Sequence, residues 1–233
     1  MSTTDDFNQL KETIEMMDEK QVLTPNMPVD VFNQEAEDLY QLALADKEKL
    51  TQRGLKEESI QALNVAAGAC RYAEAEWNKE RNAKQEAQRQ WKEKSPEAYE
   101  LRDDLMDEFE FAFVRNGSLL SVLDRIKDGN GDADMIQDLV DLSVLGKENT
   151  EVLATTHCDI TLLDRAESMA DEMADLLGMA NGAKNENNEA KVLRDKAYTY
   201  LKAHVDEVRR YGKFVFRKDR DHAAKYASEY RRD

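Results

Sequence analysis

The chain has 233 residues, of which 35% are charged, and a formal net charge of −16 at pH 7. Such a charge argues against general binding to nucleic acid or anionic lipid, and no apolar run approaches the ~20 residues of a membrane helix. The first ten residues, MSTTDDFNQL, lack the basic and apolar regions of a signal peptide. Cys70 and Cys158 lie far apart and predict no disulfide framework. We therefore expect a cytoplasmic protein with two buried thiols.

The first third of the chain predicts two helices separated by a proline-containing linker. Residues 7–17 carry apolar side chains every three or four positions, which is typical of a short helix. Pro25 and Pro28 then push the residues before them out of the helical region. A second helix is expected over residues 30–54.

The next predicted helix begins near residue 56 and is apolar along one side as far as Trp77. The following stretch, residues 78–90, is polar on nearly every face, so we expect the solvated far end of this helix there. Ser95 and Pro96 form a pair typical of an N-cap and a first helical turn. A further helix is therefore predicted from residue 96 to residue 126, antiparallel to the helix that begins near residue 56.

The segment 128–134, DGNGDAD, begins like a calcium loop. Oxygen ligands occupy its first, third and fifth positions: Asp128, Asn130 and Asp132. The sixth position needs Gly but is Ala133, and the twelfth needs a carboxylate but is Leu139. We interpret the segment as a turn in which an aspartate caps the next helix, and weak calcium binding is left open.

The second half of the chain predicts further helices and no strands. The expected helices span residues 134–146, 159–181 and 190–212, and the middle one ends at Asn181–Gly182. Residues 213–219 are expected to be extended or irregular, before a final short helix. The predicted fold class is therefore all-α.

An internal repeat indicates how these helices are organised. The segments EAYELRD at 97–103 and EAKVLRD at 189–195 share the pattern Glu-Ala-x-x-Leu-Arg-Asp, and each would open a long helix after a polar turn. We therefore predict an elongated bundle of two related antiparallel helical units, with the polar residues 78–90 as the overhang of the longer hairpin. The predicted parts are an accessory N-terminal helix and linker (1–28), a first unit (29–133), a shorter second unit (134–212) and a C-terminal cap (213–233).

The C-terminal segment NNEAKVLRDKAYTYLKAHVDEVRRYGKFVF, residues 187–216, resembles the ends of certain bacterial helical proteins of unknown function that are built as duplicated bundles. The resemblance implies a helical bundle in the bacterial cytoplasm. It carries no catalytic motif, so it implies no activity and no site residue.

Side chains suited to catalysis or metal binding form no recognisable set. The histidines are His157, His204 and His222. None of them completes the Glu-x-x-His pattern of di-iron bundles, and Gly146–Lys147 lacks the first glycine of a Walker A loop. We predict no enzyme activity, no cofactor, no metal site and no small-molecule substrate.

The last 25 residues, 209–233, are the most distinctive stretch. They hold nine Lys or Arg and four Asp or Glu, a net of +5, which leaves −21 for the other 208 residues (−16 minus +5). Aromatic residues are interleaved with these charges: Tyr211, Phe214, Phe216, Tyr226 and Tyr230. Two interpretations follow. The tail packs on the acidic bundle with its aromatic side chains in the core, or it contacts an acidic partner or nucleic acid.

The predicted function is therefore that of a non-enzymatic structural or protein-interaction bundle. Its partner would be another protein or a second copy of the chain, as in a homodimer; nucleic acid is disfavoured, and no membrane contact is expected. The alternative is an adaptor that binds nucleic acid or an acidic partner through residues 209–233. The candidate contact residues are Arg209, Arg210, Lys213, Arg217, Lys218 and Arg220.

Overall fold

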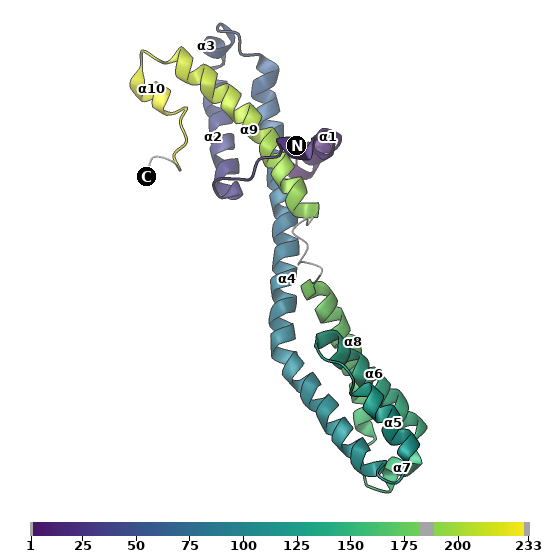
Figure 1. Ribbon diagram of the computed structural model, residues 1–233. Coiled ribbons are helices and arrows are strands. Elements are labelled where there is room, and N and C mark those ends of the chain that lie inside the picture. The colour runs from purple at the N-terminus through teal and green to yellow at the C-terminus, as the bar shows by residue number, and fades with distance from the viewer. Residues whose placement is uncertain (1, 182–188, 231–233) are drawn as a thin grey trace. The chain divides into compact units, whose positions relative to one another are not determined.

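The computed structural model describes residues 2–181 and 189–230 (Figure 1). Every regular element within these ranges is a helix, so the prediction of an all-α fold is confirmed. The predicted helix end at Gly182 and the last three residues of the basic tail lie outside the described residues. Among the helices of the described ranges, none is long and apolar enough to cross a membrane.

The chain divides into two compact units. Unit 1 holds residues 1–80 and 187–233, and unit 2 holds residues 81–186. Unit 1 thus brings together both ends of the chain, whereas the predicted parts followed one another in sequence. The proposed internal duplication stays a prediction.

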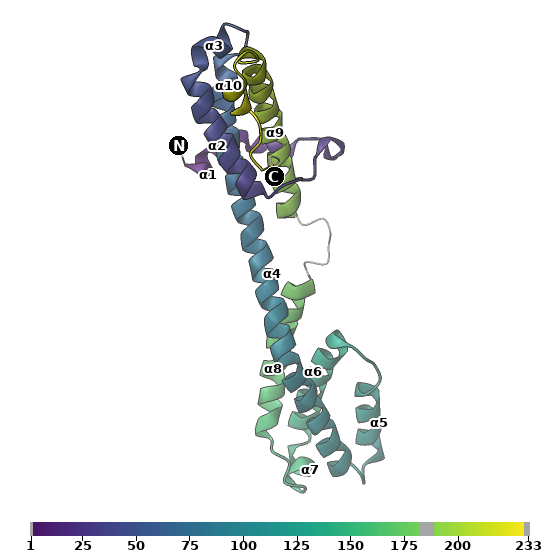
Figure 2. The same cartoon turned by 90° about the vertical axis from the view of Figure 1, so that its left-hand side faces the viewer.

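Unit 1 is built around α9, which packs against α1, α2, α3 and α10 and lies beside the first part of α4 in both views (Figures 1 and 2). Its elements are α1 (Thr3–Glu15), the 3-10 turn Glu19–Gln21, α2 (Val29–Ala45), α3 (Lys47–Thr51), the first part of α4 (Glu57–Ala112), α9 (Glu189–Val215) and α10 (Arg220–Ala224). The core draws fully buried side chains from α1, α4 and α9, among them Ile14, Leu63 and Leu201. Burial of such a side chain contributes about 1.5–3 kcal/mol.

Unit 2 packs α6 against α8, with the second part of α4 beside them. Its further elements are α5 (Gly117–Ile126), α6 (Asp132–Glu148), α7 (Thr150–Ala154) and α8 (Thr161–Asn181). The core includes Phe109, Leu139 and Met173, none of which is exposed. Gly146, predicted to end a helix, lies buried inside α6, which continues to Glu148.

The predicted helix break at Ser95–Pro96 is wrong. Helix α4 runs without interruption from Glu57 to Ala112, with Pro96 inside it. Proline in a helix interior lacks one backbone donor and costs about 3 kcal/mol. Here the ring of Pro96 is exposed, and the next turns bury Ala98 and Leu101 in the core of unit 2. Packing of the residues that follow therefore offsets the cost of the proline.

The predicted hairpin and its overhang are wrong for the same reason. The chain leaves α4 only after Ala112, and the side chain of Asn116 caps α5 by accepting a hydrogen bond from the Leu119 backbone. Residues 78–90 are helical, as predicted, and only Ala87 among them is buried. They lack an apolar stripe because they lie in the middle of α4, where the division between the units falls.

The two copies of the Glu-Ala-x-x-Leu-Arg-Asp pattern make matching contacts in different units. Arg102 binds the neighbouring Asp103 at 2.6 Å, as Arg194 binds Asp195. Each arginine also lies over an aromatic ring and near a carboxylate from elsewhere in its unit. In unit 2 this carboxylate is Asp138, 3.7 Å from Arg102.

The buried Asp138 gives unit 2 a measurable pH dependence. Its burial, reinforced by neighbouring acidic groups, raises the pKa of Asp138 to about 6. The folded state then binds this proton more tightly than the unfolded state does. The free energy of unfolding therefore falls as the pH rises from about 4 to about 6.

We expect Asp138→Asn to stabilise the protein at pH 7 by on the order of 1–2 kcal/mol, because it removes the buried charge. At pH 4 the difference from the original protein should vanish. Urea unfolding followed by circular dichroism at both pH values measures this, with Asp124→Asn, an exposed position in the same unit, as control. If Asp138→Asn were less stable than the original protein at pH 7, the raised pKa of Asp138 would be contradicted.

Candidate functional site

Helix α9 does not stop at Gly212, as the sequence predicted, but continues to Val215. Gly212 is buried with the ring of Tyr226 directly against it: a Cβ atom at Gly212 would lie 2.1 Å from Cδ1 of Tyr226. The glycine therefore permits the close approach of the tail and does not end the helix. The prediction that residues 213–219 are extended or irregular is wrong for residues 213–215, which are helical, whereas residues 216–219 form an irregular turn.

Two aromatic side chains of the tail, Phe216 and Tyr226, belong to the core of unit 1. For these two residues, the prediction that the tail packs on the bundle is confirmed. The Tyr226 hydroxyl donates a 2.8 Å hydrogen bond to Oδ2 of the buried Asp46, and Nε2 of His222 lies 2.6 Å from the same oxygen. The His222 ring packs on Phe216, with ring centroids 3.8 Å apart. One carboxylate thus anchors two side chains of the tail.

A second carboxylate, Glu35 on α2, holds the end of the described tail. Its Oε1 atom accepts hydrogen bonds from the backbone N–H groups of Glu229 and Tyr230 at 2.8 and 3.0 Å. Its Oε2 atom lies 2.6 Å from Nη2 of Arg209, and the Ser228 hydroxyl lies 2.9 Å from both oxygens. Burial acts to raise the pKa of Glu35, but these donors outweigh it, and the pKa is lowered. Glu35 therefore keeps its charge.

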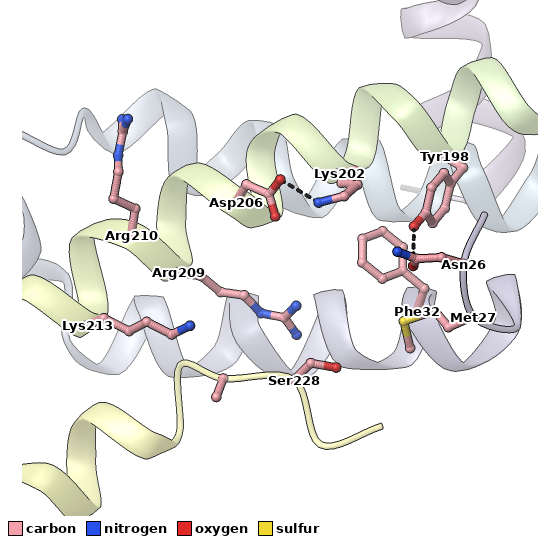
Figure 3. Close-up of a pocket in the computed structure, with 11 residues that line it drawn as sticks. Asn26, Met27, Phe32, Tyr198, Lys202, Asp206, Arg209, Arg210, Lys213 and Ser228 are labelled. Atoms are coloured by element: carbon pink, nitrogen blue, oxygen red, sulfur yellow. Dashed lines mark hydrogen bonds and ion pairs between the residues drawn. The ribbon is translucent and has the colours of Figure 1, made fainter. Parts of the chain in front are cut away.

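The tail, α9 and the start of α2 line an open pocket of about 690 Å³ (Figure 3). The linker before α2 contributes Asn26 and Met27, α2 contributes Phe32, and the tail contributes Ser228. Tyr198 of α9 donates a 3.3 Å hydrogen bond to Oδ1 of Asn26, which fixes one end of the pocket.

The charged side chains of this pocket all come from α9. Its charged residues are Lys202, Asp206, Arg209, Arg210 and Lys213, so the lining carries a net charge of +3 (four cations minus one carboxylate). Lys202 and Asp206 pair with each other at 2.5 Å. Arg210 and Lys213 form no ion pair with any residue of the described ranges. In Figure 3 the side chains of Arg209 and Lys213 point into the pocket, whereas Arg210 projects from the other side of α9.

The structure divides the six predicted contact residues into two groups. Arg209, Arg210 and Lys213 line the pocket, and Arg217, Lys218 and Arg220 are exposed outside it.

Two aromatic side chains of the tail remain open to solvent. Phe214 and Tyr230 are about half exposed, and the guanidinium of Arg217 lies 4.4 Å from the Phe214 ring centroid. These two rings therefore do not enter the core, in contrast to the prediction for Phe214.

Sequence reasoning did not identify Lys202, Ser228 or Glu35 as parts of this site. Glu35 is 174 positions from Arg209, so no local pattern links the two residues. Charge along α9 could have pointed to Lys202, which lies on the same helical face as Arg209.

A second cavity, of about 830 Å³, is lined by residues of α1, α4 and α9. Carboxylates dominate its lining, among them Glu15, Glu76 and Glu189. Acidic surface is expected in a chain with a net charge of −16. A positively charged pocket is unexpected in such a chain, and we therefore take the basic pocket as the candidate site.

The acidic segment 128–134 forms the turn between α5 and α6, as predicted. The expected aspartate cap is wrong, because Gly131, with φ of 108°, stands at the N-cap and α6 begins at Asp132. The Asp132 carboxylate accepts a 3.0 Å hydrogen bond from the Tyr99 hydroxyl. Within the described ranges, no three His, Cys, Asp or Glu side chains are grouped so that they could hold a metal ion.

The two thiols and His204 lie in environments typical of packing. Cys70 and Cys158 are both buried, as predicted, and burial raises the pKa of each thiol. Burial also lowers the pKa of His204, which packs edge-on against Tyr200. A thiol with a raised pKa is a poor nucleophile at neutral pH.

In comparisons with known proteins, no family model, no curated protein and no solved structure matches this chain.

The contact between Gly212 and Tyr226 predicts a specific loss of stability. Gly212→Ala should displace the Tyr226 ring and cost about 1–3 kcal/mol through overpacking. The control is Gly178→Ala in α8, where an added Cβ meets nothing within 4 Å and should be neutral or stabilising by about 0.5–1 kcal/mol. Chemical denaturation measures both, and hydrogen exchange locates the change. Equal stability of the two variants would show that the tail does not pack as described.

Proposed function

We propose that this protein is a non-enzymatic interaction protein, and that the basic pocket of unit 1 binds an acidic region of a partner protein. The observation that carries the proposal is the net positive lining of the pocket, into which Lys213 points without a carboxylate partner in the described ranges. Complementary charge steers partners to a surface and fixes their register.

The position of Lys213 supports a binding role. Lys213 points the same way as Arg209, which Glu35 holds in place, so part of the surface is ordered before a partner arrives. Preorganised side chains bind with a smaller loss of conformational entropy. The raised thiol pKa values of Cys70 and Cys158 also favour a binding protein over a thiol enzyme.

The second candidate function is an adaptor for nucleic acid. The observation in its favour is the group of exposed cations outside the pocket, Arg217, Lys218 and Arg220, of which Arg217 lies over the exposed ring of Phe214. Such a surface would neutralise phosphates with little dependence on the pocket, and its affinity would fall steeply with salt.

Affinity capture with two charge-reversed variants tests the proposal. Arg210→Glu/Lys213→Glu changes the pocket, and Lys218→Glu/Arg220→Glu applies the same change of charge to the tail outside it. In extracts of the producing cells, a partner protein should be retained by the original chain and by the outer variant, and lost by the pocket variant. Mass spectrometry identifies the partner, which includes the case of a second copy.

Equal loss of the partner with both variants would point to general attraction by the tail and contradict a role for the pocket. Retention by both would remove the pocket from the interaction. Treating the extract with nuclease distinguishes the two candidate functions. Capture that depends on nucleic acid would be lost after the treatment, whereas direct binding of a partner protein would persist.

A further inference from the structure

The pocket is elongated, because its lining residues on α9 recur along one helical face. The intervals between these residues are three or four positions along α9: Tyr198, Lys202, Asp206, Arg209 and Lys213. The span from Tyr198 to Lys213 corresponds to roughly 22 Å at ~1.5 Å per residue. An extended chain of about seven residues, at ~3.3 Å per residue, has this length. The shape therefore suits a peptide segment.

Charge is not uniform along this face. The Lys202–Asp206 pair is neutral as a unit, and the positive end lies at Arg209 and Lys213. Two carboxylates, Asp206 and Glu35, lie next to the cations. A nucleic acid carries a phosphate at every step and would meet these carboxylates, whereas a peptide with acidic residues at one end and neutral residues at the other would avoid them.

The chain itself shows how a carboxylate is bound beside this pocket. Glu35 accepts a hydrogen bond from Nη2 of Arg209 and from the Ser228 hydroxyl. The other terminal nitrogen of Arg209, Nη1, has no hydrogen-bond partner within the described ranges. A second carboxylate can therefore bind Nη1 of Arg209 while Glu35 keeps Nη2. Lys213, which points the same way in Figure 3, supplies the second positive group.

We infer that the basic pocket binds a short acidic peptide segment of the partner along α9, with its carboxylates at Arg209 and Lys213 and its neutral residues beside the Lys202–Asp206 pair. The inference rests on the proposed function and adds the class and orientation of the ligand. Glu35 acts as a positioning residue, because it holds both Arg209 and the tail wall around Ser228.

Fluorescence anisotropy with the full chain tests the inference. The probe is a dye-labelled peptide of about seven residues, the length of the groove, with glutamates at one end and neutral residues at the other. Lys213→Ala should weaken binding about ten-fold, as expected for one lost charge-assisted contact. A peptide with glutamine in place of glutamate should bind the original chain at least as weakly as the glutamate peptide binds Lys213→Ala. Lys218→Ala, on the same tail outside the pocket, should leave the affinity unchanged.

Glu35→Gln provides a second and opposite readout. Glutamine keeps an oxygen that can accept hydrogen bonds from the tail, but it removes the negative charge next to Arg209. The acidic peptide should then bind a few-fold more tightly, since one repulsive carboxylate is gone. Hydrogen exchange of Glu229 and Tyr230 checks that the tail stays in place.

The inference would be overturned by an unchanged affinity in Lys213→Ala, by equal binding of the glutamine peptide, or by equal binding of a single-stranded RNA of the same charge. Weaker peptide binding in Glu35→Gln with the tail still protected would do so too. If the peptide fails to bind while the pocket variant still loses its partner in the capture experiment, the inference falls and the proposed function stands. If no partner depends on the pocket, both fall.

Discussion

The carboxylate of Glu35 is the interaction on which the basic pocket depends. It binds the Arg209 guanidinium, the Ser228 hydroxyl and two backbone N–H groups, so one partly buried charge joins α2, α9 and the C-terminal segment. Burying a carboxylate without partners is costly. The four donors compensate for that cost, and the lowered pKa of Glu35 is the measure of their effect. With an apolar residue in place of Glu35, the backbone N–H groups of Glu229 and Tyr230 and the Ser228 hydroxyl would lose their acceptor, and the tail would no longer be held against the pocket.

A second carboxylate, Asp46, completes the attachment of the tail. The Tyr226 hydroxyl and His222 both meet it, while the ring of Tyr226 fills the space above Gly212. The tail is thus held by apolar burial at one point and by charge at another. This leaves a surplus of positive charge in the pocket, into which Lys213 points without a carboxylate partner in the described ranges. That surplus, in a chain with net charge −16, is the physical basis for proposing an acidic partner.

Helical periodicity was sufficient to predict the all-α fold and the short N-terminal helix. It failed where a local signal was outweighed by packing at a distance. Ser95–Pro96 has the form of a helix start, yet the burial of Ala98 keeps α4 continuous. Gly212 has the form of a helix stop, yet its role depends on Tyr226, which follows 14 positions later. The basic tail was recognisable from charge, but the choice of Arg209 and Lys213 depends on contacts that no local pattern contains.

The central claim is that an acidic segment binds along α9 against a tail held by Glu35. Titration of the isotopically labelled chain with the acidic peptide, followed by amide chemical shifts in NMR spectra, tests it most directly. The account predicts that the shifts concentrate on residues 202–213 and on Ser228, with few changes at Lys218 and Arg220. Shifts confined to residues 217–220, or spread evenly over the basic tail, would contradict it.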